Sequence, residues 1–218
     1  MAKDLAIVLN NGSINSAVAT ALAAQKFRPV LLYAETASPA LSRARAAYDH
    51  QVAHFKPYRE HVLGMPFLAG VQQEATSMSL AADTRQGTML ARHLADLLPL
   101  VATAGRFAAH YQAAAVYLGL RVGPAGDEMA QASEYVQVFN ELLQLPCGQS
   151  DLEVVAPLLE LEGWQVIDVG FQVNAPLDRT WSCLEQTDDP CWSCRGCRAR
   201  EQAFVQSGKP DPLKAGRK

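Results

Sequence analysis

The stretch LAIVLNNGSINS, residues 5–16, decides the fold of this chain. Its first five residues are an uninterrupted apolar run of strand length, which is typical of a parallel strand covered on both faces. An Asn-Asn-Gly turn follows at once, and the Ala-rich residues 16–26 then predict a helix with Asn15 as its N-cap. A buried strand that turns directly into a helix is the opening unit of a doubly wound α/β domain.

The same alternation continues along the chain. Further strands are predicted at 29–34, 59–63, 115–119 and 154–158. Helices are predicted at 41–55, 88–98, 103–114, 133–144 and 165–169, with Pro99 separating the second from the third. Strands that alternate with helices in this way predict a Rossmann-like fold with a mostly parallel sheet. Residues 64–88 show no clear period, so we expect a long loop or insertion there.

Composition divides the chain into three parts. Residues 1–177 have the α/β pattern and predict one domain, and residues 178–205 contain a cysteine-rich segment. Residues 206–218 are predicted to be a disordered tail, because residues 207–218 carry two Pro, two Gly and three Lys and almost no apolar side chains. The α/β domain is therefore expected to end in a short cysteine-rich appendage followed by a mobile end.

Overall composition excludes several classes of protein. The 218 residues are 49% hydrophobic and 19% charged, which excludes disorder for most of the chain. The net charge of -3 argues against a general nucleic-acid binder, which is usually strongly basic. Every apolar stretch falls short of the ~20 residues that a bilayer span requires. Since the apolar run at the N-terminus ends in a turn instead of a cleavage site, we expect a cytoplasmic protein without membrane contact.

Four cysteines lie within fifteen residues near the C-terminus: Cys183, Cys191, Cys194 and Cys197. The last three form two overlapping Cys-x-x-Cys turns, a spacing that lets neighbouring thiolates reach one ion. Such a cluster predicts a structural Zn²⁺ site, because four thiolates leave no open coordination position for chemistry. An iron–sulfur cluster is the alternative, although the Cys-Pro that continues the common ferredoxin run does not follow here.

The turn after the first strand is a candidate phosphate-binding loop. Asn11, Gly12, Ser13, Asn15 and Ser16 stand between a buried strand and a helix, where backbone N–H groups and the helix dipole attract anions. The pattern matches neither of the common glycine-rich phosphate motifs. An ordinary strand–helix turn accounts for these residue types equally well.

Two runs near the C-terminus carry a family resemblance. PLDRTWSC at 176–183 and PCWSCRGCRAR at 190–200 resemble the end of the 7-cyano-7-deazaguanine synthase family, where these runs hold a zinc ion. A thinner, colinear likeness covers 5–120. The resemblance implies a PP-loop ATP pyrophosphatase fold, of the adenine nucleotide alpha hydrolase-like type. It also implies an ATP-dependent carbon–nitrogen ligase that converts 7-carboxy-7-deazaguanine and ammonia to the nitrile used in queuosine biosynthesis, and it implies a homodimer. The two central Ala-rich helices are the contact faces that we expect for such a dimer.

Departures from the family pattern concern its reactive positions. The family's Ser-Gly-Gly-x-Asp-Ser loop aligns with residues 11–16, of which only Gly12 and Ser16 match. The positions that would contact the base fall on Ala130 and Ala132, which have no hydrogen-bonding side chain, and an expected lysine falls on Gly163.

Two interpretations follow from these departures. The lost groups favour a zinc-containing relative that is non-catalytic or repurposed, because removing one positioned electrostatic group costs about 10²–10³ in rate. ATP and Mg²⁺ are then doubtful cofactors, and the old pocket is free to take another nucleotide or deazapurine-like molecule or a protein. A working ligase with a divergent pocket is the alternative.

Overall fold

The computed structural model describes residues 4–35, 41–68, 89–124, 127–185 and 187–215. Its centre is a five-stranded parallel sheet in the order β3-β2-β1-β4-β5. The strands are β1 (Leu5–Leu9), β2 (Arg28–Glu35), β3 (Arg59–Gly64), β4 (Ala115–Leu118) and β5 (Glu153–Val155). After β1 the chain continues to β2 and β3 on one side of β1, and it then returns to β4 on the other side of β1. The strand order therefore reverses between β1 and β4, where doubly wound sheets bind ligands.

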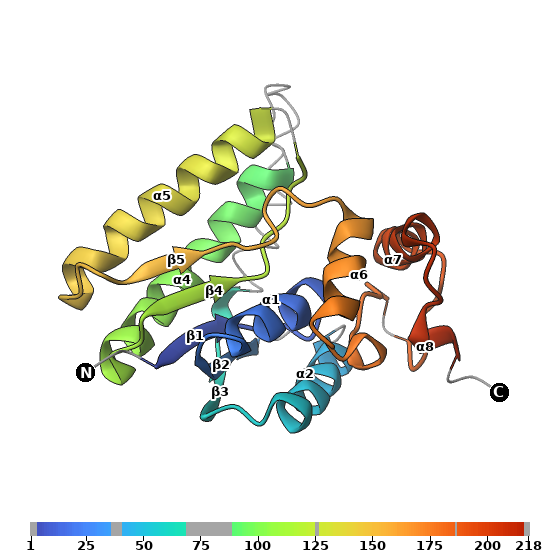
Figure 1. Ribbon diagram of the computed structural model, residues 1–218, viewed down its shortest axis with the longest axis horizontal. Helices are drawn as coiled ribbons and strands as arrows, with labels where there is room; N and C mark the ends of the chain where they lie inside the picture. The colour runs from blue at the N-terminus through green and yellow to red at the C-terminus, as the bar shows by residue number, and fades with distance from the viewer. Residues whose placement is uncertain (1–3, 36–40, 69–88, 125–126, 186, 216–218) are drawn as a thin grey trace.

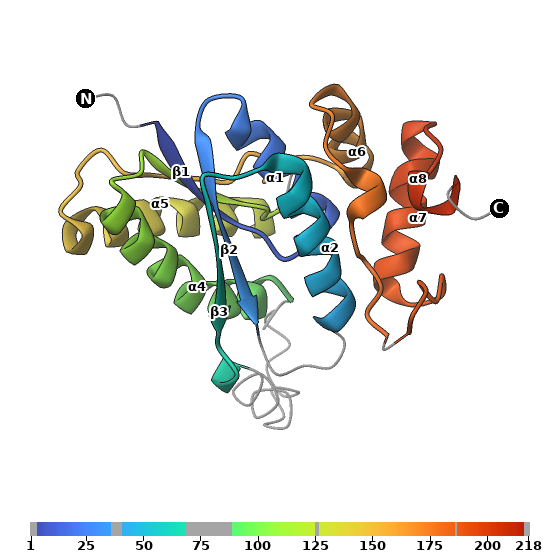
Figure 2. The same ribbon diagram turned by 90° about the horizontal axis from the view of Figure 1, so that it is seen from below.

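Helices cover both faces of this sheet (Figure 1). The helical elements are α1 (Ile14–Ala24), α2 (Leu41–Phe55), α4 (Met89–Tyr111), α5 (Asp127–Cys147), α6 (Gly163–Gln172), η2 (Leu177–Arg179, a 3₁₀ turn), α7 (Arg195–Ser207) and α8 (Pro212–Ala215). α4 and α5 lie on one face, and α1 and α2 lie on the other. α6 packs against α1 and α7 packs against α6, so the C-terminal part adds outer layers on the α1 side (Figure 2).

The apolar run of β1 explains this two-sided arrangement. Ile7 points to the α4–α5 face, where it packs with Val30 and Val116. Ala6 and Val8 point to the opposite face and pack with the side chains around Tyr33. Successive residues of a strand alternate between faces, so a strand covered on both sides must be apolar at every position. The prediction of a doubly wound α/β fold is confirmed.

Several predicted boundaries are wrong. The two helices expected on either side of Pro99 are one helix, α4, which continues through the proline. An internal proline costs about 3 kcal/mol, but Val101, Ala104 and Ala108 on this helix are fully buried in the core. Their packing outweighs the local penalty, and the Thr103 hydroxyl donates to the Pro99 carbonyl at 2.7 Å.

Smaller differences concern the ends of other elements. α1 begins at Ile14 with Ser13 as its N-cap, two residues before the predicted start. β5 ends at Val155 and α6 runs from Gly163 to Gln172, so this strand is shorter and this helix longer than predicted. Most of the loop expected at 64–88 lies outside the described residues, which stop at Leu68 and resume at Met89.

The predicted disordered tail at 206–218 is folded as far as Ala215. α7 continues to Ser207, Gly208 ends it in a left-handed conformation, and α8 follows. Asp211 is buried and forms an ion pair with Arg200 of α7. The composition of this segment is polar, but the partner of the Asp211 carboxylate lies eleven residues upstream, in the part of α7 that the prediction assigned to the cysteine-rich segment. No helix among the described residues is long and apolar enough to cross a membrane.

Candidate nucleotide loop and metal centre

The loop after β1 lies at the point where the strand order reverses, between β1 and β4. Gly12 has a φ of 79°, a left-handed conformation that favours glycine. A Cβ atom here would lie 2.3 Å from the backbone carbonyl oxygen of Ala44 in α2. Gly119, directly after β4, is also confined, since its Cβ would lie 2.9 Å from the Ser16 amide nitrogen. Both glycines are therefore required for the close packing of backbone segments around the loop.

Side chains at and beside the loop accept hydrogen bonds from the loop's own backbone N–H groups. The Gly12 N–H donates to Asn10 Oδ1 at 2.8 Å, and the Ser13 N–H donates to Asn11 Oδ1 at 3.1 Å. The Ser16 N–H donates to the Ser13 hydroxyl at 3.3 Å. A phosphate-binding loop works by directing such N–H groups at the ligand. In this chain three of them already have an internal acceptor.

The buried side-chain amides of Asn10 and Gln51 support the loop, and the site residues predicted from the sequence included neither of them. Asn10 donates through Nδ2 to Gln51 Oε1 at 2.9 Å and to the Thr20 hydroxyl at 3.1 Å. Gln51, fully buried on α2, donates through Nε2 to the carbonyl oxygens of Gly12 at 3.0 Å and Arg179 at 3.1 Å. A polar residue on a predicted helix is ordinarily solvated, so nothing in the sequence identified Gln51.

The Thr-Trp-Ser-Cys run reaches the same loop from the C-terminal side. The Trp181 backbone N–H donates to the Gly12 carbonyl at 2.9 Å, so Gly12 accepts from both α2 and this run. One residue further on, Ser182 packs against α7, where a Cβ on Gly196 would lie 2.0 Å from the Ser182 carbonyl oxygen. Residues 180–182, called the strap below, therefore join the loop to the cysteine segment.

Arg200 holds the strap in place. It is 3% exposed and donates two hydrogen bonds of 2.7 Å to the Asp211 carboxylate. It also donates to the Thr180 hydroxyl at 2.7 Å and to the Leu177 carbonyl at 3.1 Å. A buried guanidinium needs a carboxylate and further acceptors to offset its desolvation, and all are present here.

The four cysteines meet in one cluster, as predicted. Their sulfur atoms all lie within 4.8 Å of one another. Cys183 and Cys194 are separated by 3.9 Å between Sγ atoms, and Cys191 and Cys197 by 4.0 Å. Four thiolates about 2.3 Å from one tetrahedral ion would be about 3.8 Å apart. The cluster therefore has the donor set and the spacing to hold a single metal ion.

Neighbouring hydrogen-bond donors favour the thiolate form, which is the form that binds metal, at one of these cysteines. The pKa of Cys191 is lowered to about 6, because the Ser193 hydroxyl and neighbouring backbone N–H groups donate to its sulfur. Burial raises the pKa of Cys197 to about 12. Since the metal ligand is the thiolate, the buried Cys197 sulfur needs the charge of a cation to ionise near neutral pH.

Other predicted positions do not supply the groups that the resemblance leads one to expect. Ala132 is fully buried against Leu159 and Met129, so its methyl group faces the protein interior. A Cβ on Gly163 would lie 3.3 Å from the Ala203 side chain, which directs that position towards α7. Near the loop, Arg43 pairs with Asp188, and Arg45 pairs with both Glu35 and Asp49.

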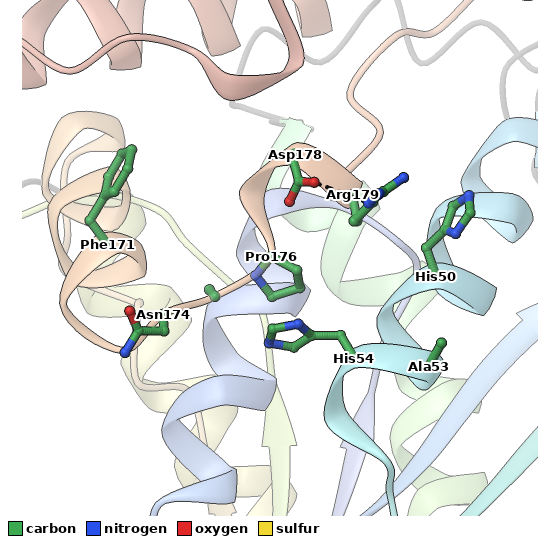
Figure 3. Close-up of a pocket in the computed structure, with 9 residues that line it drawn as sticks. His50, Ala53, His54, Phe171, Asn174, Pro176, Asp178 and Arg179 are labelled. Atoms are coloured by element: carbon green, nitrogen blue, oxygen red, sulfur yellow. Dashed lines mark ion pairs between the residues drawn. The ribbon is translucent and has the colours of Figure 1, made fainter. Parts of the chain in front are cut away.

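A groove of about 660 Å³ lies between α2, the end of α6 and η2 (Figure 3). His50 and His54 project into it from α2, and the ion pair between Asp178 and Arg179 lies across from them. Gln51, next to His50, points the other way into the protein. The groove is thus on the outer side of α2, and none of residues 10–16 lines it.

Comparison with known proteins places these features in a family. The family model for "Queuosine biosynthesis protein QueC" matches residues 5–208. A 7-cyano-7-deazaguanine synthase from Methanothrix thermoacetophila is 31% identical over 115 residues, which are 52% of this chain and 51% of that protein. The chain thus spans about half the length of that relative in the match. The corresponding enzyme from Methanosarcina barkeri is 23% identical over 95% of this chain and 96% of its own length.

The fold has a similar counterpart among solved structures. The NMN synthetase from Francisella tularensis superposes with a TM-score of 0.51 at 15% identity, covering 97% of this chain and 82% of that one. At this identity the likeness shows the fold alone. The family model, by contrast, spans the loop after β1, the strap and all four cysteines. This chain belongs to the family of the queuosine biosynthesis protein QueC.

Proposed function

We propose that this chain is a zinc-containing QueC relative whose nucleotide loop no longer performs the family's ATP chemistry. The observation that carries the proposal is the occupation of the loop amides by Asn10, Asn11 and Ser13. An incoming phosphate would have to displace these acceptors before it could bind. The 7-cyano-7-deazaguanine synthase activity named for the relatives needs ATP phosphates held in such a loop. A loop that does not hold these phosphates therefore cannot support the reaction.

The chemistry of the missing groups supports the same conclusion. Adenylyl transfer from ATP to a carboxylate develops charge in the transition state. Hydrogen-bond donors and cations that are already in position must stabilise that charge. Asn15 is neutral where the family pattern has an acid, and Gly163 lacks the cation expected there. The guanidinium groups of Arg43 and Arg45 are already paired with carboxylates. The scaffold therefore remains while the groups that would bind and polarise ATP do not.

The metal in this proposal is one structural Zn²⁺ held by the four cysteines. Its thiolates close the segment between Cys183 and Cys197, which carries the strap at one end and the start of α7 at the other. With four protein ligands the ion keeps no open position for water or substrate, so it supplies folding energy and no acid–base chemistry. Elemental analysis of protein purified without chelators should find one equivalent of zinc, and a finding of iron would contradict the assignment.

Nucleotide binding and turnover test the functional proposal directly. Calorimetry with ATP and with AMP, with and without Mg²⁺, should detect weak binding or none in the unmodified chain. The triple variant Asn11→Ser, Ser13→Gly, Asn15→Asp should gain affinity for ATP, because it frees the Ser13 and Ser16 amides and restores the acid. It should not gain turnover, since the lysine and base-contacting groups remain absent.

A charge-matched control separates a local effect from a global one. Gln137→Glu adds the same negative charge on the exposed side of α5, away from the loop, and should leave ATP affinity unchanged. If the unmodified protein instead releases AMP and pyrophosphate in a manner that depends on 7-carboxy-7-deazaguanine and ammonia, the proposal is wrong and the chain is a working ligase.

A further inference from the structure

The groove on the outer side of α2 brings together polar side chains that the fold itself does not use. His50 and His54 enter it from α2, and Asn174 and Arg179 line it from the segment that follows α6 (Figure 3). Within the described part of the chain, the two imidazoles, the Asn174 side-chain amide and the Nη atoms of Arg179 have no hydrogen-bond partner. Its volume of about 660 Å³ is that of a pocket for a small molecule.

Buried contacts hold the two walls of this groove in place. Gln51, next to His50 and fully buried, donates to the Arg179 carbonyl at 3.1 Å and so joins α2 to η2. Leu177, the first residue of η2, is 3% exposed, and its carbonyl accepts from the buried Arg200 guanidinium at 3.1 Å. Walls that are already fixed lose little conformational freedom when a ligand binds, so the groove is a preformed site.

The Arg179 guanidinium indicates the charge of the ligand. Its Nε atom pairs with the Asp178 carboxylate at 3.0 Å, which leaves both Nη atoms able to donate. Figure 3 shows the guanidinium extending from η2 towards the side of α2 that carries His50. A guanidinium donates best to the oxygens of a carboxylate or a phosphate, and an imidazole N–H adds a further donor. This side of the groove therefore suits an anionic group.

An apolar wall completes the groove beside these donors. Phe171, at the end of α6, is 39% exposed, and Pro176 lies between it and α2 (Figure 3). The Lys209 ammonium lies 5.5 Å from the centroid of the Phe171 ring, but it is paired with Asp168 and does not line the groove. Ligand sites combine such apolar walls with a few polar groups that fix orientation. The arrangement suits an anion that carries an aromatic or aliphatic body.

A divalent metal ion is the alternative ligand, because His50 and His54 stand four residues apart on one helix, a spacing found in metal sites. The structure favours the anion for two reasons. Among the described residues, the cysteine cluster is the only set of three or more such side chains whose ligand atoms converge. The positive charge of Arg179 on the opposite wall would also oppose a cation.

We propose that this groove binds a small organic anion. A carboxylate or phosphate group of the ligand contacts Arg179 and His50, and its apolar body lies against Phe171 and Pro176. The site is separate from the loop after β1, because none of residues 10–16 lines the groove. The proposal therefore holds whether or not that loop binds ATP.

Nuclear magnetic resonance titrations of the zinc-loaded full chain at neutral pH test the proposal with simple probes. Phenyl phosphate and benzoate carry the two kinds of anionic group on an aromatic ring. Benzyl alcohol has the ring without the charge, and inorganic phosphate has the charge without the ring. At least one aromatic anion should saturably shift the resonances of residues 50–54 and 171–179, and its partner anion shows whether phosphate or carboxylate fits better. Both partial probes should bind several-fold more weakly.

Substitutions on the two walls give opposite expected signs. Arg179→Gln should raise the dissociation constant of the tighter anion at least tenfold, because it removes a charged donor. Asp178→Asn should lower that constant several-fold, since it releases Arg179 Nε and removes a negative charge. Arg43→Gln is the matched control. Arg43 also lies partly exposed and paired with a carboxylate, but it does not line the groove, so this variant should bind like the unmodified chain.

Several results would overturn the proposal. One is the absence of a saturable shift up to about 10 mM of either aromatic anion, ten times the dissociation constant of a weak ligand. Another is a set of shifts confined to residues 10–16, or equal weakening by Arg43→Gln, which would locate the anion at the loop after β1. Tighter binding in Arg179→Gln, or weaker binding in Asp178→Asn, would identify a cation site instead. Circular dichroism spectra that match the unmodified chain keep each variant informative.

Discussion

Replacing Asp211 by alanine should destabilise the whole C-terminal part of the molecule. The side chain of Asp211 is 5% exposed and the side chain of its partner Arg200 is 2% exposed. The substitution removes two charge-assisted hydrogen bonds of 2.7 Å and leaves the guanidinium in the protein interior without a counter-charge. Arg200 keeps only neutral acceptors, the hydroxyl of Thr180 and nearby carbonyl oxygens.

The expected magnitude follows from this burial. Breaking a buried ion pair by removing one partner costs about 3–5 kcal/mol, and each charge-assisted hydrogen bond contributes about 1.5–3 kcal/mol. Asp178→Ala is the matched control, because Asp178 forms an ion pair with Arg179 at a similar distance of 3.0 Å but both side chains are about half exposed. A surface pair of this kind contributes about 0–1 kcal/mol.

Urea unfolding of the zinc-loaded protein, followed by far-ultraviolet circular dichroism, measures the difference in free energy of unfolding between the two variants. Amide hydrogen exchange shows which residues lose protection in Asp211→Ala. Because Arg200 binds Thr180 and the next residue, Trp181, donates to Gly12, Asp211→Ala should speed exchange in the strap and at residues 10–13 as well as near position 211. A difference below about 1 kcal/mol between the variants, or faster exchange confined to 209–215, would refute the reasoning.

Three further predictions concern single sites. Gly12→Ala should cost at least about 1–3 kcal/mol from its left-handed backbone alone, and more from the clash with Ala44, as measured by urea unfolding. Cys194→Ser, or removal of the metal by a chelator, should open residues 178–205 to limited proteolysis and lower the melting temperature; protection equal to that of the untreated protein would exclude a structural metal. The pKa of His61 is lowered below its ordinary value of 6.5 by burial, and also by His110 and Arg59. The unfolded chain therefore binds this proton more readily, so the contribution of His61 to stability should fall as the pH drops below 6.5. His61→Gln should reduce that dependence in urea titrations at pH 5.5 and 7.5.

Local signals were sufficient where one segment carries all the information. The run at 5–9 is apolar at every position, and only a strand covered on both faces needs that pattern. The cysteine spacing is similar, since a Cys-x-x-Cys turn brings its own ligands together whatever surrounds it. Boundaries were less predictable. Pro99 locally favours a break, but the packing of Val101 and Ala104 outweighs it, and that packing depends on strands far away in the sequence.

The sequence by itself determined the α/β class, the central strand and the four-cysteine cluster, because these depend on periodicity and short spacings. Only the tertiary structure decided what surrounds the loop. Gln51 and Trp181 both donate to Gly12, although 39 and 169 residues separate them from it. Arg200 and Asp211 likewise become a buried pair only because α7 and the last turn fold back on η2. A polar side chain in a sequence shows that it needs a hydrogen-bond partner, but which partner it meets is set by how the elements pack.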